Sequence, residues 1–373
     1  MPRFLHTADW QIGRAYTTFA PDIAPILAEA RFTAVQRLAE LAREHAVDAV
    51  LVAGDVLDAQ TVSDKTIRRL FQCMAAYSGP WLLIAGNHDA ALTESVWSRA
   101  QRLQCVPPHV HLLMQPEVKV FAEAGFAVLP APLTQRHTYH DLTAWMDAAD
   151  TPAGLLRIGL AHGSVQGLLH EGIDSANPIA LTRCDTARLD WLALGDWHGV
   201  KSVNDRMAYS GTPEPDRFPN NEPGFALLVD IPAPGALPQV QRLLVGQYRW
   251  QRIVVDVQHP SDVDALQLQL QQLGTHDVVQ LVLRGQLDWA QHQRLQQALA
   301  NTEARVRCLI TAQDGLRLAP TDEDLGSLQA DGYVGELLAE LRAESLAGQE
   351  GAQAALHVLA SALYQQPQHG SAA

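Results

Sequence analysis

Polar side chains that can bind metal ions follow one predicted strand after another in the first two hundred residues. Each apolar run ends in a short segment that carries acidic, amide or imidazole groups, often beside a glycine. These groups are Asp9 and Gln11 in A-D-W-Q-I-G, Asp55 and Asp58 in G-D-V-L-D, Asn87 and His88 in G-N-H-D, His162 in A-H-G, and Asp196 and His198 in G-D-W-H-G. Side chains at the carboxyl ends of parallel strands converge on one crevice of an α/β sheet. The spacing therefore predicts a single site built from all of these segments.

The donor types favour divalent cations and phosphate chemistry. Carboxylate, amide oxygen and imidazole groups without cysteine suit Mn²⁺, Mg²⁺, Fe or Zn²⁺ rather than a structural thiolate site. Two cations about 4 Å apart can activate water and clamp a phosphate, and Asp55 is the natural bridge between them. His88 is then free to protonate the leaving oxygen, with Asp58 orienting its ring. We therefore expect a two-metal phosphodiesterase.

The segments between these motifs predict a layered α/β domain. Apolar runs indicate strands at Arg3–Thr7, Val47–Ala53 and Trp81–Ala85, and helical spacing indicates helices at Pro25–His45 and Ser63–Tyr77 between them. Further strands are expected at Val118–Phe121, Phe126–Ala131, Leu156–Ala161, Trp191–Leu194 and Phe225–Asp230. This alternation of strands and helices would bring the polar segments to one edge.

A smaller α/β unit and a helical tail are expected after the Pro- and Gly-rich stretch Pro232–Pro238, which marks a turn or the approach to a boundary. Strands at 252–257, 277–284 and 304–310 alternate with helices at 262–273 and 289–300. Thr321–Asp324 resembles a capping box, and two apolar stripes follow it. We expect domains at 1–240, 241–319 and 320–373. The tail either packs on its own chain or docks a partner helix.

Composition limits the classes of protein. The 373 residues include 27 basic and 41 acidic residues, for a net charge of −14, which argues against a non-specific nucleic-acid binder. The apolar runs are too short to span a membrane, and the first residues lack the apolar core of a secretory signal. The four cysteines lie far apart, with no C-x-x-C pair. We therefore expect a reduced, cytoplasmic protein with no membrane association.

The ordered motifs resemble those of the calcineurin-like metallophosphoesterase superfamily. The opening L-H-T-A-D-W-Q-I-G-R, the segment Tyr209–Pro215 (Y-S-G-T-P-E-P) and the trailing α/β unit are similar to its SbcD-type DNA repair nuclease branch. The resemblance covers about residues 1–310. It implies a four-layer αββα sandwich with a small α/β cap domain and a helical C-terminal tail.

The resemblance also assigns roles. It implies a first metal held by Asp9, Gln11, Asp55 and His198, and a second held by Asp55, Asn87, His162 and Asp196. His88 matches the proton donor and Asp58 its orienting partner. Family members are Mn²⁺-dependent nucleases that act on DNA ends as exonucleases or endonucleases. They assemble with an SMC-like coiled-coil ATPase, which binds helices after the cap domain, and they are often homodimers.

Two departures from the family pattern leave alternatives open. Gln11 and Asp196 stand where the family usually has His. Replacing nitrogen by oxygen predicts a harder site that favours Mn²⁺ or Mg²⁺ over Zn²⁺, and the alternative is a weakened first site. The alternative functions are a phosphoesterase for a small nucleotide or diphosphate substrate, and a weakly catalytic scaffold subunit.

The roles of four residues in or beside the motifs have two interpretations each. Trp10 and Trp197 either stack on a nucleobase or pack beneath the metal loops. Arg14 and Arg217 either hold phosphates or form surface ion pairs.

Overall fold

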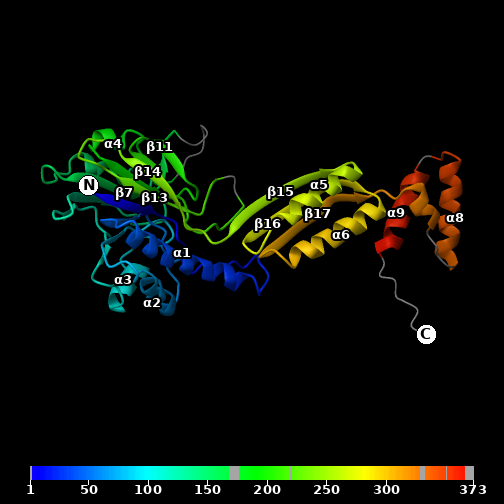
Figure 1. Cartoon of the computed structure of the whole chain (residues 1–373), viewed down its shortest axis with the longest axis horizontal. Helices are drawn as coiled ribbons and strands as arrows, with labels where there is room; N and C mark the ends of the chain where they lie inside the picture. Colours follow the sequence, from blue (N-terminus) through cyan, green and yellow to red (C-terminus); the bar gives the residue numbers. More distant parts are fainter. Residues whose placement is uncertain (1, 168–175, 219–220, 328–331, 350, 366–373) are drawn as a thin grey trace. The chain divides into compact units, whose positions relative to one another are not determined.

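The computed structural model describes residues 2–167, 176–218, 221–327, 332–349 and 351–365. The chain divides into two compact units, Met1–Arg249 and Trp250–Ala373 (Figure 1). The first unit holds two large sheets, and the second holds a three-stranded sheet and the C-terminal helices. The expected division into three domains stays a prediction.

Each large sheet of the first unit has six strands. In the first sheet, β1 (Arg3–Thr7), β2 (Ala49–Val52), β3 (Trp81–Leu83) and β4 (Val110–Leu112) are parallel. β13 (Phe225–Asp230) pairs antiparallel with β1, and β14 (Gln239–Leu244) pairs antiparallel with β13. The stretch Pro232–Pro238 is therefore the connection of a hairpin inside the first unit.

The second sheet has the order β11-β12-β10-β7-β6-β5. Its parallel strands are β6 (Phe126–Ala131), β7 (Leu156–His162), β10 (Trp191–Gly195) and β12 (Met207–Tyr209). The edge strands β5 (Lys119–Phe121) and β11 (Lys201–Asn204) pair antiparallel with their neighbours. β8 (Ser164–Val165) and β9 (Pro178–Ile179) form a separate small ladder.

Three apolar cores define four layers. One core contains side chains from both sheets, such as Phe4, Leu51, Phe126 and Ile158, and therefore lies between them. A second core packs α1 (Ala24–Glu44), α2 (Asp64–Cys73) and α3 (Val96–Arg102) on the first sheet. The third packs the short helices η1 (Ala144–Asp147) and α4 (Arg183–Thr186) on the second sheet. The expected αββα sandwich is confirmed.

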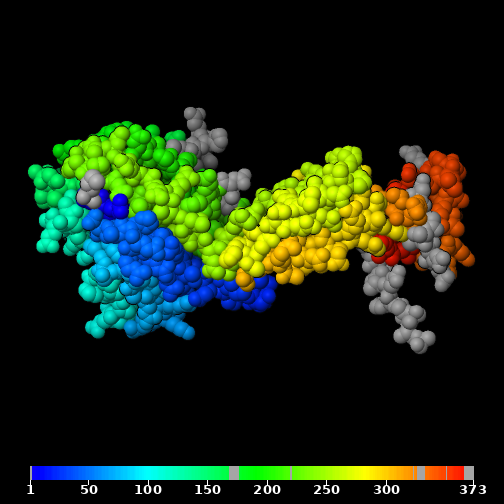
Figure 2. Space-filling view, in the orientation of Figure 1, coloured from blue at the N-terminus to red at the C-terminus, as the bar shows by residue number. Residues whose placement is uncertain are grey.

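Local sequence explains where the helices of the first unit lie. α1 has a proline in its first turn, and it buries one side through residues such as Leu27, Leu38 and Leu41. Its other side is on the outer surface, in blue (Figure 2). α2 begins after Ser63, whose hydroxyl accepts a hydrogen bond from the Thr66 amide at 3.1 Å.

The second unit is built on β15 (Arg249–Val257), β16 (Asp277–Leu287) and β17 (Cys308–Leu318). The helices α5 (Pro260–Gln271) and α6 (Trp289–Glu303) contribute to the core of this sheet. The strand expected at 304–310 begins only at Cys308, because Ala304 is the C-cap of α6.

The tail forms α7 (Asp322–Ser327), α8 (Gly332–Leu346) and α9 (Ala352–Gln365). Thr321 and Asp324 form the expected reciprocal capping box, with contacts of 2.8 and 3.1 Å. Leu338 of α8 and Leu356 of α9 share a small core with Trp289 of α6. Tyr364 stacks on the Trp289 ring at 4.8 Å between centroids, so the tail packs on its own unit.

No helix within the described ranges combines the length and apolar composition needed to cross a lipid bilayer.

Candidate metal centre

The expected site residues follow the carboxyl ends of parallel strands in both sheets. Asp9 and Gln11 follow β1, Asp55 follows β2, and Asn87 and His88 follow β3; His162 ends β7, and Asp196 and His198 follow β10. The β1 and β2 loops are joined by hydrogen bonds from the Asp9 amide to the Gly54 carbonyl at 3.1 Å and from the Gln11 amide to the Asp55 carbonyl at 2.9 Å. The centre therefore lies at the shared edge of two rigid sheets.

The backbone at four of these positions is strained. Asp9, Gln11, Asp55 and Asp196 have φ values of 55°, 44°, 52° and 105°. Such conformations cost about 1–3 kcal/mol each in residues other than glycine and persist where the surrounding structure enforces them. The sharp turns bring consecutive polar side chains to one place.

Two glycines leave room for the candidate ligands. A Cβ atom on Gly86 would lie 2.2 Å from Asp55 Oδ1, and one on Gly54 would lie 2.5 Å from His162 Nδ1. Gly54 also has a φ of +86°, which favours glycine. The loops after β2 and β3 can approach this closely only because both positions lack side chains.

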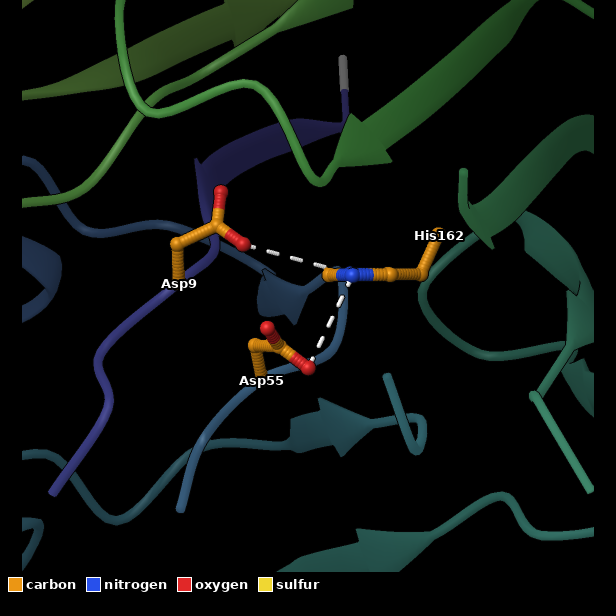
Figure 3. Close-up of side chains that lie close together, drawn as sticks. All are labelled: Asp9, Asp55 and His162. Atoms are coloured by element: carbon orange, nitrogen blue, oxygen red, sulfur yellow. Dashed lines mark ion pairs between the residues drawn. The ribbon is translucent and has the colours of Figure 1, made fainter. Parts of the chain in front are cut away.

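Three buried ligands form the centre of the cluster (Figure 3). Asp9, Asp55 and His162 each offer one ligand atom, and these atoms lie within 4.8 Å of one another. The His162 ring lies 4.0 Å from Asp9 Oδ1 through Nδ1 and 3.6 Å from Asp55 Oδ1 through Nε2. Burial raises the pKa of the Asp9 carboxyl, and the neighbouring carboxylate of Asp55 adds to this shift.

The surroundings of His162 fit a cation. Its Nδ1 donates a hydrogen bond to the Ala53 carbonyl at 2.8 Å, so a neutral ring has a bare lone pair on Nε2. Within the described part of the chain, the polar contacts of that nitrogen are oxygen atoms: Asn87 Oδ1 at 2.9 Å, Asp55 Oδ1 at 3.6 Å and Asp196 Oδ1 at 3.8 Å. Burial opposes charge on the ring, yet these carboxylates and that of Asp9 raise the pKa of His162 to about 9. A proton or a metal ion on Nε2 would satisfy these acceptors.

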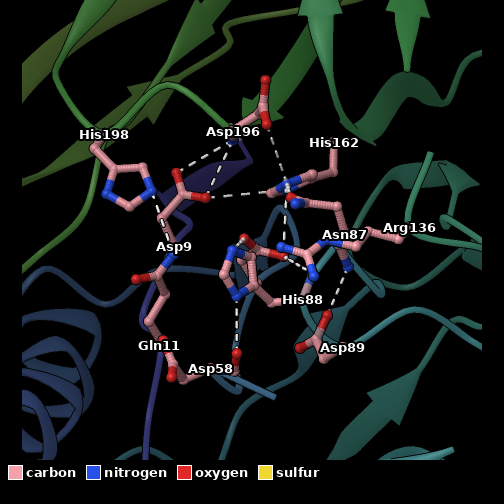
Figure 4. A network of polar contacts seen from close by, with 12 residues as sticks. Asp9, Gln11, Asp58, Asn87, His88, Asp89, Arg136, His162, Asp196 and His198 are labelled. Carbon is pink, nitrogen blue, oxygen red and sulfur yellow. Dashed lines mark hydrogen bonds and ion pairs between the residues drawn. The ribbon is translucent and has the colours of Figure 1, made fainter. Parts of the chain in front are cut away.

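His198 and Gln11 form a second group beside the first (Figure 4). His198 Nδ1 donates to the Asp216 carboxylate at 3.2 Å, and its Nε2 lies 3.4 Å from Gln11 Nε2. The Asp196 amide donates to both Asp9 carboxylate oxygens at 3.1 and 3.2 Å, which joins the two groups. The Gln11 oxygen, however, accepts a bond from Arg14 at 2.6 Å and does not face His198.

His88 is held by the main chain of its expected partner. His88 Nδ1 donates to the Asp58 main-chain carbonyl at 2.8 Å, and the His88 amide donates to Asp55 Oδ1 at 2.9 Å. The Asp58 carboxylate instead lies 3.8 Å from Arg14. The expectation that the Asp58 side chain orients the His88 ring is therefore wrong. The contact is made by the Asp58 main-chain carbonyl, a group that every residue type has.

A polar cavity of about 400 Å³ opens onto the cluster. It is lined by Gln11, Arg14, Asp55, Asn87, His88, Asp196, His198 and Arg217. Both arginines also lie within 3.3 Å of the Asp216 carboxylate. They thus form ion pairs and line the cavity at the same time.

The two tryptophans have different surroundings. Trp10 is buried, donates its ring N–H to the Thr7 hydroxyl at 2.9 Å and packs edge-on against Trp81, as the packing alternative predicted. Trp197 is 36% exposed, with the Lys201 ammonium 4.8 Å above its ring. Only Trp197 has a surface available for stacking.

Sequence reasoning missed two buried carboxylates. Asp216 accepts the hydrogen bond of His198 and lies in an irregular loop. It does not follow a strand, so the search for polar residues at strand ends could not find it. The feature that could have pointed to it is its position directly after the Tyr209–Pro215 motif. Asp89 accepts bonds from the Gly86 amide at 2.7 Å and the Leu57 amide at 3.0 Å, and it ties together the β2 and β3 loops. Its position inside G-N-H-D was a signal that could have found it.

Comparisons with known proteins agree with this geometry. The profile of the calcineurin-like phosphoesterase family matches residues 2–198, which include every expected ligand. The uncharacterized metallophosphoesterase YhaO of Bacillus subtilis is 26% identical over 310 residues, which cover 76% of this chain and 71% of that protein. The SbcD component of the SbcCD nuclease is 39% identical over 94 residues in Rhodobacter capsulatus and 35% over 95 residues in Escherichia coli K12.

The nuclease matches are local: each covers 24% of this chain and 22% of the relative. The family match, in contrast, spans more than half of the chain and both ligand-bearing sheets. The chain therefore belongs to the calcineurin-like phosphoesterase family.

Proposed function

We propose that this chain is a two-metal phosphodiesterase that cleaves DNA and acts in DNA repair, with Mn²⁺ as the first choice of cation and Mg²⁺ or Fe as alternatives. The observation that carries the proposal is the buried Nε2 of His162, which faces three oxygen acceptors at 2.9–3.8 Å. The membership in a family of phosphoesterases supports hydrolysis of a phosphoester.

The proposed ligands form two sets that share one carboxylate. Asp9, Gln11, Asp55 and His198 would hold one cation, and Asp55, Asn87, His162 and Asp196 would hold the other. Bound cations would supply Lewis acidity and neutralise the charge of a phosphate group. Asp216 and the Ala53 carbonyl orient the two histidines through their Nδ1 atoms, so that each Nε2 is directed into the centre.

His88 is proposed as the proton donor. Because Nδ1 donates to the Asp58 carbonyl, a second proton on the ring must lie on Nε2. His88 also lines the cavity, so this proton can reach an oxygen of a bound phosphoester. When water attacks phosphorus and the P–O bond breaks, the leaving oxygen takes the proton from Nε2. The proton that the attacking water loses passes to solvent, and solvent restores the proton on His88.

Activity on DNA is supported by positive charge at the cavity and by the relatives' names. Arg14 and Arg217 line the cavity and can pair with phosphate oxygens. Trp197 has an exposed ring that could stack on a base. Two relatives bear the name of a nuclease subunit, although they match over only 22% of their length.

Cleavage of an end-labelled DNA duplex tests the proposal. The full chain should cut the duplex with Mn²⁺ and lose this activity in EDTA. His88→Ala should lower the rate by about 10²–10⁴-fold while the Mn²⁺ content stays unchanged. His357→Ala, in α9, is the matched control and should keep the rate. An unchanged rate in His88→Ala would refute the proposal that His88 donates the proton. Absence of any Mn²⁺-dependent hydrolysis would refute the proposal that the chain is a phosphodiesterase.

A small phosphodiester is the second candidate substrate. The cavity volume of about 400 Å³ lies in the range typical of small-ligand pockets. A chain that hydrolyses thymidine 5′-(p-nitrophenyl phosphate) but leaves duplex and single-stranded DNA intact would favour this candidate. Cleavage of DNA at a higher kcat/KM would favour the first.

We also propose assembly with an SMC-like coiled-coil ATPase and a homodimer, both on the basis of the resemblance and of relatives named as subunits. Light scattering after size exclusion should give twice the mass of the chain. Co-expression with the candidate ATPase should yield a complex that a tag on either protein recovers. A monomeric mass would refute the proposed homodimer. If neither tag recovers the other protein, the proposed assembly with the ATPase is refuted.

A further inference from the structure

The orientation of the Gln11 amide is fixed by two neighbours. Arg14 Nη1 donates to Gln11 Oε1 at 2.6 Å, and a guanidinium has only donors, so the oxygen must face it. His198 donates through Nδ1 to Asp216, which leaves a lone pair on Nε2. Gln11 Nε2 lies 3.4 Å from His198 Nε2 and can donate to its lone pair. Both neighbours therefore select the same orientation.

This orientation competes with metal binding. A glutamine binds a cation through its amide oxygen, because the NH₂ group has no free lone pair for a hard ion. Turning the amide by half a rotation would place its NH₂ group against Arg14, donor facing donor. While its oxygen faces Arg14, Gln11 presents its NH₂ group to a cation beside His198, so binding that cation requires the oxygen to turn away from Arg14.

Arg14 is well anchored in the competing position. Its amide donates to the Gln11 carbonyl at 3.2 Å, in a turn that contains Gly13 at a φ of +100°. Its guanidinium also lies 3.2 Å from Asp216 Oδ2. Around His162, in contrast, no arginine bonds to the oxygens of Asp55 or Asn87 within the described ranges.

We propose that Arg14 lowers the cation affinity of the His198 group by holding the Gln11 oxygen, so that the centre fills in two steps, with the His162 group first. This inference rests on the proposed two-cation centre. Arg14 would thus set the order in which the two cations bind, an order that the types of the ligand residues alone do not predict.

Metal binding without turnover tests the inference. The EDTA-treated full chain is titrated with Mn²⁺ at about pH 8.5, where competition from the proton on His162 is small. Bound Mn²⁺ is counted by electron paramagnetic resonance of the free ion. We expect two steps that differ by about tenfold or more, the effect of a hydrogen bond to a charged group. Two equal steps would overturn the role of Arg14, whereas no bound Mn²⁺ would overturn the cation centre itself.

Arg217→Met is the matched control for Arg14→Met. Arg217 lines the same cavity and lies 3.3 Å from the same Asp216 carboxylate, so its loss changes the local charge in a similar way. Within the described ranges it has no bond to Gln11. Arg14→Met should tighten the weaker step by about tenfold and clearly more than Arg217→Met. Equal effects would show that charge alone matters and would overturn the inference.

Gln11→Glu is a second, independent variant. A carboxylate has two oxygens, so one can stay with Arg14 while the other faces the cation. The weaker step should therefore tighten with Arg14 still in place, and Arg14→Met should add less to it than in the parent chain. If Gln11→Glu leaves the weaker step unchanged, the competition for one oxygen is not its cause. This result decides the question even where Arg14→Met fails to fold.

Discussion

Cation binding should depend steeply on pH because of one proton on His162. Nδ1 of this ring donates to Ala53, so the extra proton of the charged ring lies on Nε2, among the oxygens that would surround a cation. Burial disfavours the charge, but the surrounding carboxylates raise the pKa of His162 to about 9. The metal-free protein therefore keeps this proton at neutral pH, and a cation must displace it.

The expected magnitude follows from that pKa. Below about pH 9 each cation that binds at His162 releases one proton, so its apparent association constant should rise about tenfold per pH unit. From pH 6.5 to 8.5 the increase is about a hundredfold. The affinity is lost as pH falls, and Asp9 should steepen the loss on the acid side, because burial raises the pKa of its carboxyl as well.

Isothermal titration calorimetry measures both the affinity and the proton. The EDTA-treated chain is titrated with Mn²⁺ at several pH values, each in two buffers of different ionisation enthalpy. The difference in heat should correspond to about one proton per tightly bound cation. His162→Asn should bind more weakly and lose the pH slope. If the parent chain binds Mn²⁺ with an affinity that does not change between pH 6.5 and 8.5, the reasoning about Nε2 is wrong.

Three substitutions give further tests. Gly86→Ala places a Cβ 2.2 Å from Asp55 Oδ1, so Mn²⁺ affinity should fall at least tenfold, with a cost of about 1–3 kcal/mol in the free energy of unfolding; calorimetry and urea unfolding measure the two. Asp216→Asn weakens the bond that orients His198, so Mn²⁺ affinity should fall about 10–100-fold, and the melting temperature should fall as well because this buried carboxylate also pairs with arginines. Trp289→Ala removes the ring on which Tyr364 of α9 stacks. The rate of amide hydrogen exchange should therefore rise in α9 and stay constant in β1.

Several elements could be predicted from the sequence because apolar runs are bounded by turn residues. The strands Arg3–Thr7, Phe126–Ala131 and Phe225–Asp230 have the predicted bounds. α3, with seven residues, and β4, with three, were not predicted. β14 was missed because five of its six residues are exposed at a sheet edge, where the pattern of a buried strand is absent.

The placement of the site residues could be predicted, but their side-chain orientations could not. Spacing fixes which loop carries a residue, and this rule brought Asp9, Asn87 and His198 to one edge. The rotation of the Gln11 amide depends on Arg14, three positions along the chain, and on how that loop turns. Asp58 contacts His88 through its main-chain carbonyl, and a main-chain contact cannot be predicted from the type of residue.

The position of β1 has a consequence for synthesis of the chain on the ribosome. Arg3 of β1 pairs with Asp230 of β13, so β1 is synthesised more than two hundred residues before this partner strand. At about 5–20 residues per second this delay lasts roughly 10–45 s. During that time an edge containing Phe4 and Leu5, both fully buried in the folded protein, stays open to other chains. Nascent chains should therefore depend on a chaperone, and slower translation should increase aggregation.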